Sequence, residues 1–272
     1  MTALELSGRP EGLLDDLLDL RVRGTGGADG LVWRGRIRDD EGRVWRAIAD
    51  RVQDLPSAWV PAKSSTGMLM ALTSLRPVQL QVRVEAPDGR AATRPLTRRL
   101  VADGVRIRRW RGEVPAVLHL PAGDGPFPSV VLDATGERHH RGGESDEDTS
   151  DSIAVASLAA SLLASRGVLA LVVVSAPRTD PQALLHCALE RLGSVPSVQS
   201  APRVLRVLDS TQDGHGCSPG TVVVTPPGVG VRGVGAGPEA AAARAATWDA
   251  LLAAVGAAPR MSHGIRVSDH GR

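Results

Sequence analysis

The chain has 272 residues, a formal net charge of +2 at pH 7 and an aromatic content of only 2%. A nearly balanced charge with few aromatic side chains disfavours a nucleic-acid-binding protein, which needs a basic face and stacking rings. Two cysteines are too few for a disulfide framework, and no window approaches the ~20 apolar residues of a membrane span. Residues 1–10 also lack the basic start and apolar run of a signal peptide. We therefore expect a soluble cytoplasmic protein that binds neither nucleic acid nor a membrane.

The first part of the chain contains short stretches in which apolar and polar residues alternate. Such alternation predicts β-strands, and the turn-rich segments between them predict an antiparallel, Ig-like β-sandwich over residues 1–112. The predicted strands are residues 31–37, 44–49, 78–84, 96–101 and 105–110. The leucines of residues 13–22 fit a helix or a strand, and this choice stays open.

Seven arginines lie between Arg94 and Arg111. They can attract a phosphate-rich partner, coenzyme A (CoA) included. On alternating strands, they are more simply the solvated face of the sandwich.

The second part of the chain alternates strands with helices. Strand, helix, strand, helix, strand is typical of a parallel α/β sheet, which we place at residues 113–255, with a disordered tail at 256–272. The predicted strands are residues 117–120, 129–133, 169–174, 204–208 and 221–224; the predicted helices are 153–166, 181–192 and 238–255. We expect Cys187 on the apolar side of its helix and His119 in the packing of its strand.

A polar turn follows the strand at residues 204–208 and contains Ser210. A strand that ends in serine within a tight turn has the layout of a nucleophile elbow, G-x-S-x-G, but the two glycine places hold Leu208 and Gln212. Asp213, His215 and Cys217 follow closely. The stretch is either a rebuilt site in which His215 activates Ser210 or Cys217, or a polar loop, since nucleophile and base usually come from separate loops.

Two further motifs predict no cofactor or metal. Residues 228–233 match G-x-G-x-x-G, but no helix begins before residue 238, so a dinucleotide's pyrophosphate would meet no helix N-terminus. His139 and His140 are adjacent and point in different directions on most backbones, and the acidic residues 144–151 lack the alternating ligands of a calcium loop.

In several places the chain resembles the acyl-CoA thioesterase and bile acid-CoA:amino acid N-acyltransferase family. The resemblance rests on the order of residues 67–77, 96–99, 118–128, 162–167, 196–199 and 238–248. It implies an N-terminal β-sandwich followed by an α/β-hydrolase domain, here shortened. The family's nucleophile falls on Ser210 and its catalytic histidine falls on Val222. Its catalytic acid falls in a deletion between Gly216 and Thr221.

The resemblance implies a protein that hydrolyses, transfers or binds acyl thioesters such as acyl-CoA, with a degraded catalytic site. Ser210 is the candidate nucleophile, His215 the candidate base, and Asp213 the nearby acid, with a backbone N–H as oxyanion donor. Because Val222 cannot act as a base near neutral pH, the alternative is a non-catalytic pseudoenzyme that binds a ligand or a protein. A protein partner or a homo-oligomer stays open.

Overall fold

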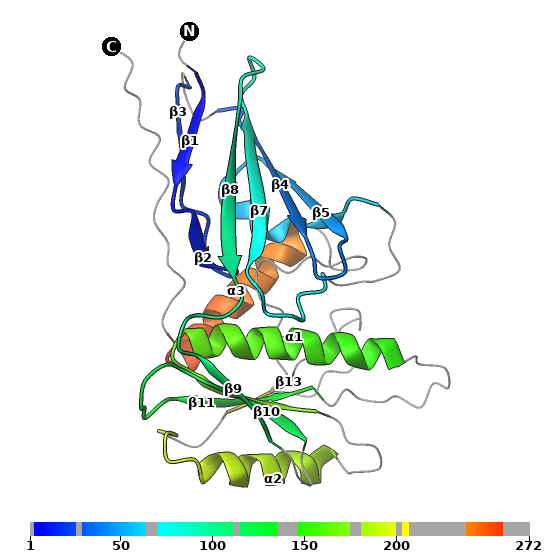
Figure 1. Ribbon diagram of the computed structural model, residues 1–272, viewed down its shortest axis with the longest axis vertical. Helices are drawn as coiled ribbons and strands as arrows, with labels where there is room; N and C mark the ends of the chain where they lie inside the picture. The colour runs from blue at the N-terminus through cyan, green and yellow to red at the C-terminus, as the bar shows by residue number, and fades with distance from the viewer. Residues whose placement is uncertain are drawn as a thin grey trace. The chain divides into compact units, whose positions relative to one another are not determined.

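The computed structural model describes residues 3–25, 29–63, 70–110, 115–134, 146–174, 181–199, 203–206 and 238–257. The chain divides into two compact units. Unit 1 comprises Met1–Leu100, Pro227–Ala243 and Arg260–Arg272; unit 2 comprises Val101–Pro226 and Arg244–Pro259. Figure 1 shows the strands and helices of both units. None of the described helices is long and apolar enough to cross a membrane.

Unit 1 contains two sheets. The smaller sheet pairs β1 (Glu5–Gly8) with β3 (Leu20–Arg23) in antiparallel fashion. The larger sheet has six strands in the order β2-β8-β7-β4-β5-β6, antiparallel except for the parallel pair β2 and β8. Its strands are β2 (Glu11–Leu13), β4 (Val32–Arg38), β5 (Val44–Ala49), β6 (Val60–Pro61), β7 (Val78–Glu85) and β8 (Ala91–Arg99), with a short 3₁₀ helix, η1 (Val52–Ser57), between β5 and β6.

The apolar and polar residues that alternate in the sequence are alternately buried and exposed in these strands. In β7, Leu80, Val82 and Val84 are buried while the residues between them are exposed. Successive side chains of a strand point to opposite faces, so a period of two gives one apolar face and one solvated face. The strand predicted at residues 44–49 is confirmed with the same bounds.

The open segment at residues 13–22 forms strands and turns in place of a helix. Leu13 ends β2, and the backbone N–H of Leu14 donates to the carbonyl of Arg99 on β8 at 2.9 Å. Leu14 and Leu18 are nonetheless buried, at 5% and 3% exposure. Pairing with β8 therefore satisfies the backbone while the leucines still reach the core, and tertiary context overrides helix propensity.

Unit 2 has a five-stranded sheet in the order β13-β11-β12-β10-β9. The strands β13, β11 and β12 are parallel, while β10 is antiparallel to both of its neighbours, so the sheet is mixed and not wholly parallel as predicted. The bounds are β9 (Arg106–Trp110), β10 (Ala116–Leu120), β11 (Ser129–Asp133), β12 (Leu169–Val173) and β13 (Arg203–Arg206).

We predicted strand 105–110 as part of the β-sandwich, and this is wrong. β9 pairs with β10, the next strand along the chain, from Arg106 opposite Leu120 to Trp110 opposite Ala116. Strands that follow one another in sequence usually pair, because little loop entropy opposes their pairing. The chain therefore leaves the unit 1 sheet after β8, and β9 already belongs to the unit 2 sheet.

Two helices connect the parallel strands and lie on opposite faces of the sheet (Figure 1). The first, α1 (Asp146–Ser165), leads from β11 to β12, and α2 (Pro181–Gly193) leads from β12 to β13 on the other side of β11. Crossovers between parallel strands are right-handed, so two crossovers that run in opposite directions place their helices on opposite faces.

The helix predicted at residues 153–166 begins earlier, at Asp146. The predicted end at Gly167 is confirmed: Gly167 has a φ of 85°, and the N–H of Val168 donates to the carbonyl of Leu163 at 3.0 Å.

The other two predicted helices are confirmed, but the place of Cys187 is not. In α2, Leu184, Ala188 and Leu192 are buried and Cys187 is exposed, because it lies beside this apolar stripe and not within it. The last helix, α3 (Pro238–Ala254), buries Trp248, Leu251 and Leu252 as expected. The predicted strand 221–224 and tail residues from 258 onward lie outside the described residues.

Candidate functional site

The carboxyl ends of the parallel strands of unit 2 lie in one row. Asp133 of β11 is the register partner of Val173 on β12 and of Arg206 on β13. The segment after β11 leads to α1 on one face, and the segment after β12 leads to α2 on the other. The helices that follow these two adjacent strands therefore lie on opposite faces of the sheet, and open α/β sheets bind their ligands at the carboxyl ends of such a pair of strands.

Asp133 is a buried carboxyl residue at this edge, with 6% exposure. It ends a strand whose five residues are all buried. We did not predict Asp133 as a site residue. The available signal was an acidic residue that closes an otherwise apolar strand.

The residues predicted to carry the chemistry, Ser210, Asp213 and His215, lie outside the described residues, and so does Cys217. The strand before them is present, since β13 pairs with β11 in parallel over Arg203–Arg206. The structure thus places the strand that leads to Ser210 beside Asp133 and does not describe the turn itself. The motifs at residues 139–140 and 228–233 also fall outside the described residues.

A buried histidine and serine lie in contact elsewhere in unit 2. Ser161 Oγ, on α1, is 3.1 Å from Nδ1 of His119, on β10, and it also donates to the carbonyl of Ser157 at 2.9 Å. A hydroxyl has one hydrogen, so Nδ1 must donate to Ser161. This direction is opposite to the one that activates a serine nucleophile.

The position of His119 also separates it from the candidate site. His119 is opposite Ala170, near the amino end of β12, whereas Val173 at the carboxyl end is opposite Asp133. Three residues along a strand span about 10 Å. The side chain is 1% exposed, and burial lowers its pKa to about 4. His119 is therefore a neutral packing residue, as predicted, and not a general base at this edge.

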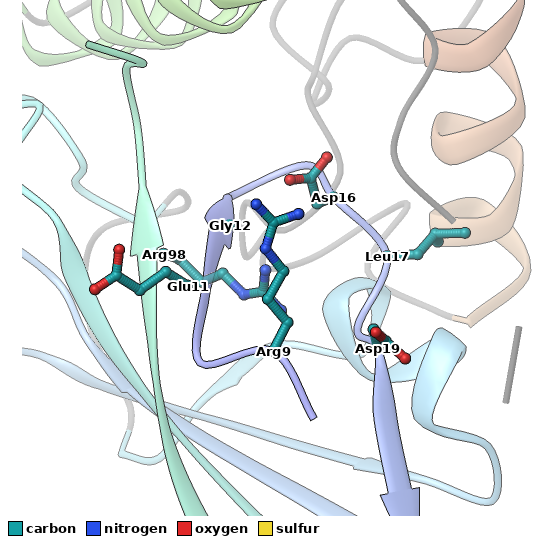
Figure 2. A pocket seen from close by; sticks show the side chains of 7 residues that line it. All are labelled: Arg9, Glu11, Gly12, Asp16, Leu17, Asp19 and Arg98. Atoms are coloured by element: carbon teal, nitrogen blue, oxygen red, sulfur yellow. The ribbon is translucent and has the colours of Figure 1, made fainter. Parts of the chain in front are cut away.

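A small pocket in unit 1 gathers charges of both signs (Figure 2). Its lining comprises Arg9, Glu11, Gly12, Asp16, Leu17, Asp19 and Arg98. The cavity volume is about 10 Å³, which is room for a single water molecule. This pocket cannot hold an organic substrate.

Arg98 in this pocket corrects the prediction that the arginines of residues 94–111 form a solvated face. Arg98 is only 4% exposed, and burial lowers the pKa of its guanidinium while the carboxylate of Asp16 opposes that shift. A side chain on Gly12 would collide with Nη1 of Arg98. Glycine at position 12 therefore makes the space in which Arg98 lies buried beside Asp16.

Within the described ranges, no three His, Cys, Asp or Glu side chains come together in a way that could hold a metal ion.

The candidate site of this protein is the carboxyl edge of the mixed α/β sheet of unit 2, where β13 leads to a serine-containing segment.

About half of the chain is similar to acyl-coenzyme A thioesterases of Mus musculus. The peroxisomal succinyl-coenzyme A thioesterase of Mus musculus is 33% identical over 160 residues, covering 47% of this chain and 38% of that protein. The mitochondrial acyl-coenzyme A thioesterase 2 of the same species is 32% identical over 161 residues, covering 48% and 36%. Acyl-coenzyme A thioesterase 6 is 32% identical over 160 residues, covering 47% and 38%.

These matches span between 36% and 38% of the length of the relatives. No protein-family model matches the chain. The relatives support the acyl-CoA thioesterase side of the resemblance that the sequence motifs indicated.

Proposed function

We propose that this chain acts on acyl-CoA thioesters through a shortened α/β-hydrolase-like domain, and that its catalytic site is degraded. The observation that carries the proposal is the placement of β13: it is parallel to β11, and the helices that follow β11 and its other neighbour β12 lie on opposite faces of the sheet. A nucleophile mounted directly after β13 would stand at the ligand-binding edge of the sheet. The thioesterase names of the relatives supply the substrate class.

In this proposal unit 2 corresponds to the catalytic domain and unit 1 to the N-terminal sandwich domain. Ser210 attacks the thioester carbonyl, His215 takes the hydroxyl proton and Asp213 orients that base. The C–S bond then breaks, and CoA leaves as its thiol with the proton that His215 held. The acceptor that then releases the acyl group is water in a hydrolase or an amine in an acyltransferase. The small number of cysteines and the exposed thiol of Cys187 favour a reducing compartment such as the cytoplasm.

A second candidate function is a non-catalytic relative that binds an acyl thioester or a protein. The observation in its favour is that three positions lack the residues that catalysis needs. Leu208 and Gln212 stand where a nucleophile elbow has glycine, and Val222 stands where the family's histidine falls. A valine has no proton to exchange and cannot replace an imidazole.

Free-thiol release from a panel of acyl-CoAs separates the two. We expect turnover by the wild type that falls by about 10³-fold or more in Ser210→Ala. Ser218→Ala, in the same stretch, is the matched control and should keep full activity. If the wild type releases no thiol at any chain length but binds acyl-CoA, the non-catalytic function replaces the catalytic one.

A further inference from the structure

The outer strand of the unit 2 sheet carries an unusual concentration of positive charge. β9 forms the edge of the described sheet, and its sequence is Arg-Ile-Arg-Arg-Trp. Its first four residues are exposed, and Ile107 is 42% exposed. We name Arg106, Arg108, Arg109 and the nearby Arg191 of α2 the arginine edge.

The faces of β9 follow from its neighbours. Trp110 packs against the core cluster that contains Leu184 and Leu192 of α2, so it lies on the α2 face of the sheet. Arg106 and Arg108 share that face, because side chains two apart in a strand point the same way. Arg191 lies over the Trp110 ring, 5.6 Å from its centroid. Arg106, Arg108 and Arg191 therefore lie on the face that holds the half-buried Trp110, and Arg191 is the one over its ring.

Within the part of the chain that the structure describes, no carboxylate pairs with the arginines of β9. Among the described residues, Arg106, Arg108 and Arg109 make no ion pair or side-chain hydrogen bond. By contrast, Arg34 and Arg83 of the unit 1 sheet share Glu85 at 3.0 and 2.8 Å. Unpaired guanidiniums with planar donor forks are suited to phosphate groups, which they bind in bidentate fashion.

Only the carboxyl end of β9 is level with the candidate site: Arg108 and Arg106 pair with Leu118 and Leu120, so they are set back from that edge by about 7 and 13 Å along the strand. Trp110 is opposite Ala116, which is opposite Val173, and the same row continues through Asp133 to Arg206. Four strand spacings separate β9 from β13, or roughly 19 Å. CoA joins its thiol to its nucleotide through a pantetheine arm of comparable extended length.

We propose that the arginine edge binds the phosphates of the CoA nucleotide while the thioester lies beyond β13. This inference rests on the proposed function for its ligand. The simpler explanation is that charge on an edge strand prevents pairing with another sheet. That role needs no clustering on one face and no cation held over a tryptophan.

The test uses the full-length protein with Arg106→Gln and Arg108→Gln combined. The matched control combines Arg36→Gln and Arg46→Gln, two exposed cross-strand arginines of unit 1. Calorimetric titration measures the affinity for adenosine 3′,5′-bisphosphate and for CoA. We expect both affinities to fall by about 10- to 100-fold in the β9 variant and to stay unchanged in the control. Added salt should weaken wild-type binding.

Hydrolysis of a thioester with and without the nucleotide distinguishes the two proposals. We expect the β9 variant to raise KM for acyl-CoA but not for the matching acyl-pantetheine. If the variant hydrolyses acyl-CoA with wild-type KM, the arginine edge is overturned and the proposed function stands. If the wild type hydrolyses neither compound and the bisphosphate affinity still falls in the variant, the arginine edge is supported and thioester hydrolysis is not.

Two other outcomes overturn the inference. The first is a wild type that does not bind adenosine 3′,5′-bisphosphate at low salt. The second is a β9 variant with unchanged affinity that forms larger assemblies in sedimentation experiments, since the arginines would then serve to block edge pairing.

Discussion

Asp39 in unit 1 and His119 in unit 2 are both buried polar side chains, at 6% and 1% exposure, and they differ in how they are satisfied. The Asp39 carboxylate accepts bonds from the backbone and side chain of Arg43, both at 2.8 Å, and from Nε1 of Trp45 at 3.0 Å. It also accepts from the backbone of Ala71 at 3.3 Å. His119 has one partner, Ser161, and its Nε2 has none among the described residues.

The pKa values of the two side chains reflect this difference. Burial raises the pKa of Asp39, but the hydrogen bonds from Trp45 and Arg43 more than offset it and the net shift is downward. Burial alone lowers the pKa of His119 to about 4. Both lowered pKa values make stability fall on acidification, but the one of Asp39 reflects hydrogen bonds that hold the buried charge, whereas the one of His119 reflects only the cost of charging a buried ring.

Asp39→Ala should have the largest effect. It removes the acceptor of the indole N–H of the fully buried Trp45 and of the Nε–H of Arg43, whose Nη1 still pairs with Glu41 at 3.1 Å. Removing one partner of a buried charged pair costs about 3–5 kcal/mol. Urea denaturation followed by far-UV circular dichroism measures the change.

The neighbouring Asp40 provides the control for this variant. It is exposed and accepts from the backbone and hydroxyl of Ser74, each at 2.8 Å. Asp40→Ala should lower the free energy of unfolding by only about 1 kcal/mol. If the free energy of unfolding falls equally in Asp39→Ala and Asp40→Ala, the several hydrogen bonds to the buried Asp39 carboxylate do not make it more stabilising than an exposed one.

The sequence predicts the turn that contains Asp39 but not the role of Asp39. The acidic residues followed by Gly42 between two alternating segments are a local turn signal, and Gly42 has a φ of 78°. The bond from Ala71 joins residues 32 apart in the chain. Such a contact depends on strand order, which no local pattern contains.

His119→Leu should remove a pH dependence from unit 2. The unfolded histidine has a pKa near 6.5 and the folded one about 4, so the unfolded state binds a proton first as the pH falls. The wild type therefore keeps its full stability above pH 6.5 and loses it between pH 6.5 and 4. By pH 5 this loss is about 2 kcal/mol.

Thermal melts at pH 7.5 and pH 5 of both proteins measure this difference. Groups other than His119 titrate equally in both proteins, so only the difference between wild type and variant is informative. Leucine leaves the bond from Ser161 to Ser157 in place. If the variant destabilises as much as the wild type on acidification, His119 is not the group responsible.

Much of the fold follows from sequence patterns, and less of the candidate site does. The strand before Ser210 and the helices on either side of it follow from apolar runs and from Gly and Pro signals. The partner of β9 and the burial of Arg98 do not, because both depend on which strand lies alongside. Asp133 became a candidate only when the register placed it beside β13.

Cys187→Ser should have the smallest effect and tests the one helix face that we predicted wrongly. Leu184, Ala188 and Leu192 define the buried stripe of α2 at intervals of four residues. Cys187 precedes Ala188 by one residue, which is about 100° around the helix, so apolar neighbours in the sequence do not bury it. An exposed substitution changes the free energy of unfolding by less than about 0.5 kcal/mol, whereas Leu184→Ala should cost about 2–4 kcal/mol.

The thiol of Cys187 should also react with Ellman's reagent in the folded wild type, and one equivalent of that reaction should disappear in Cys187→Ser. If the thiol reacts slowly and only when the protein unfolds, Cys187 is buried in the core as His119 is, and the exposed position described above is wrong.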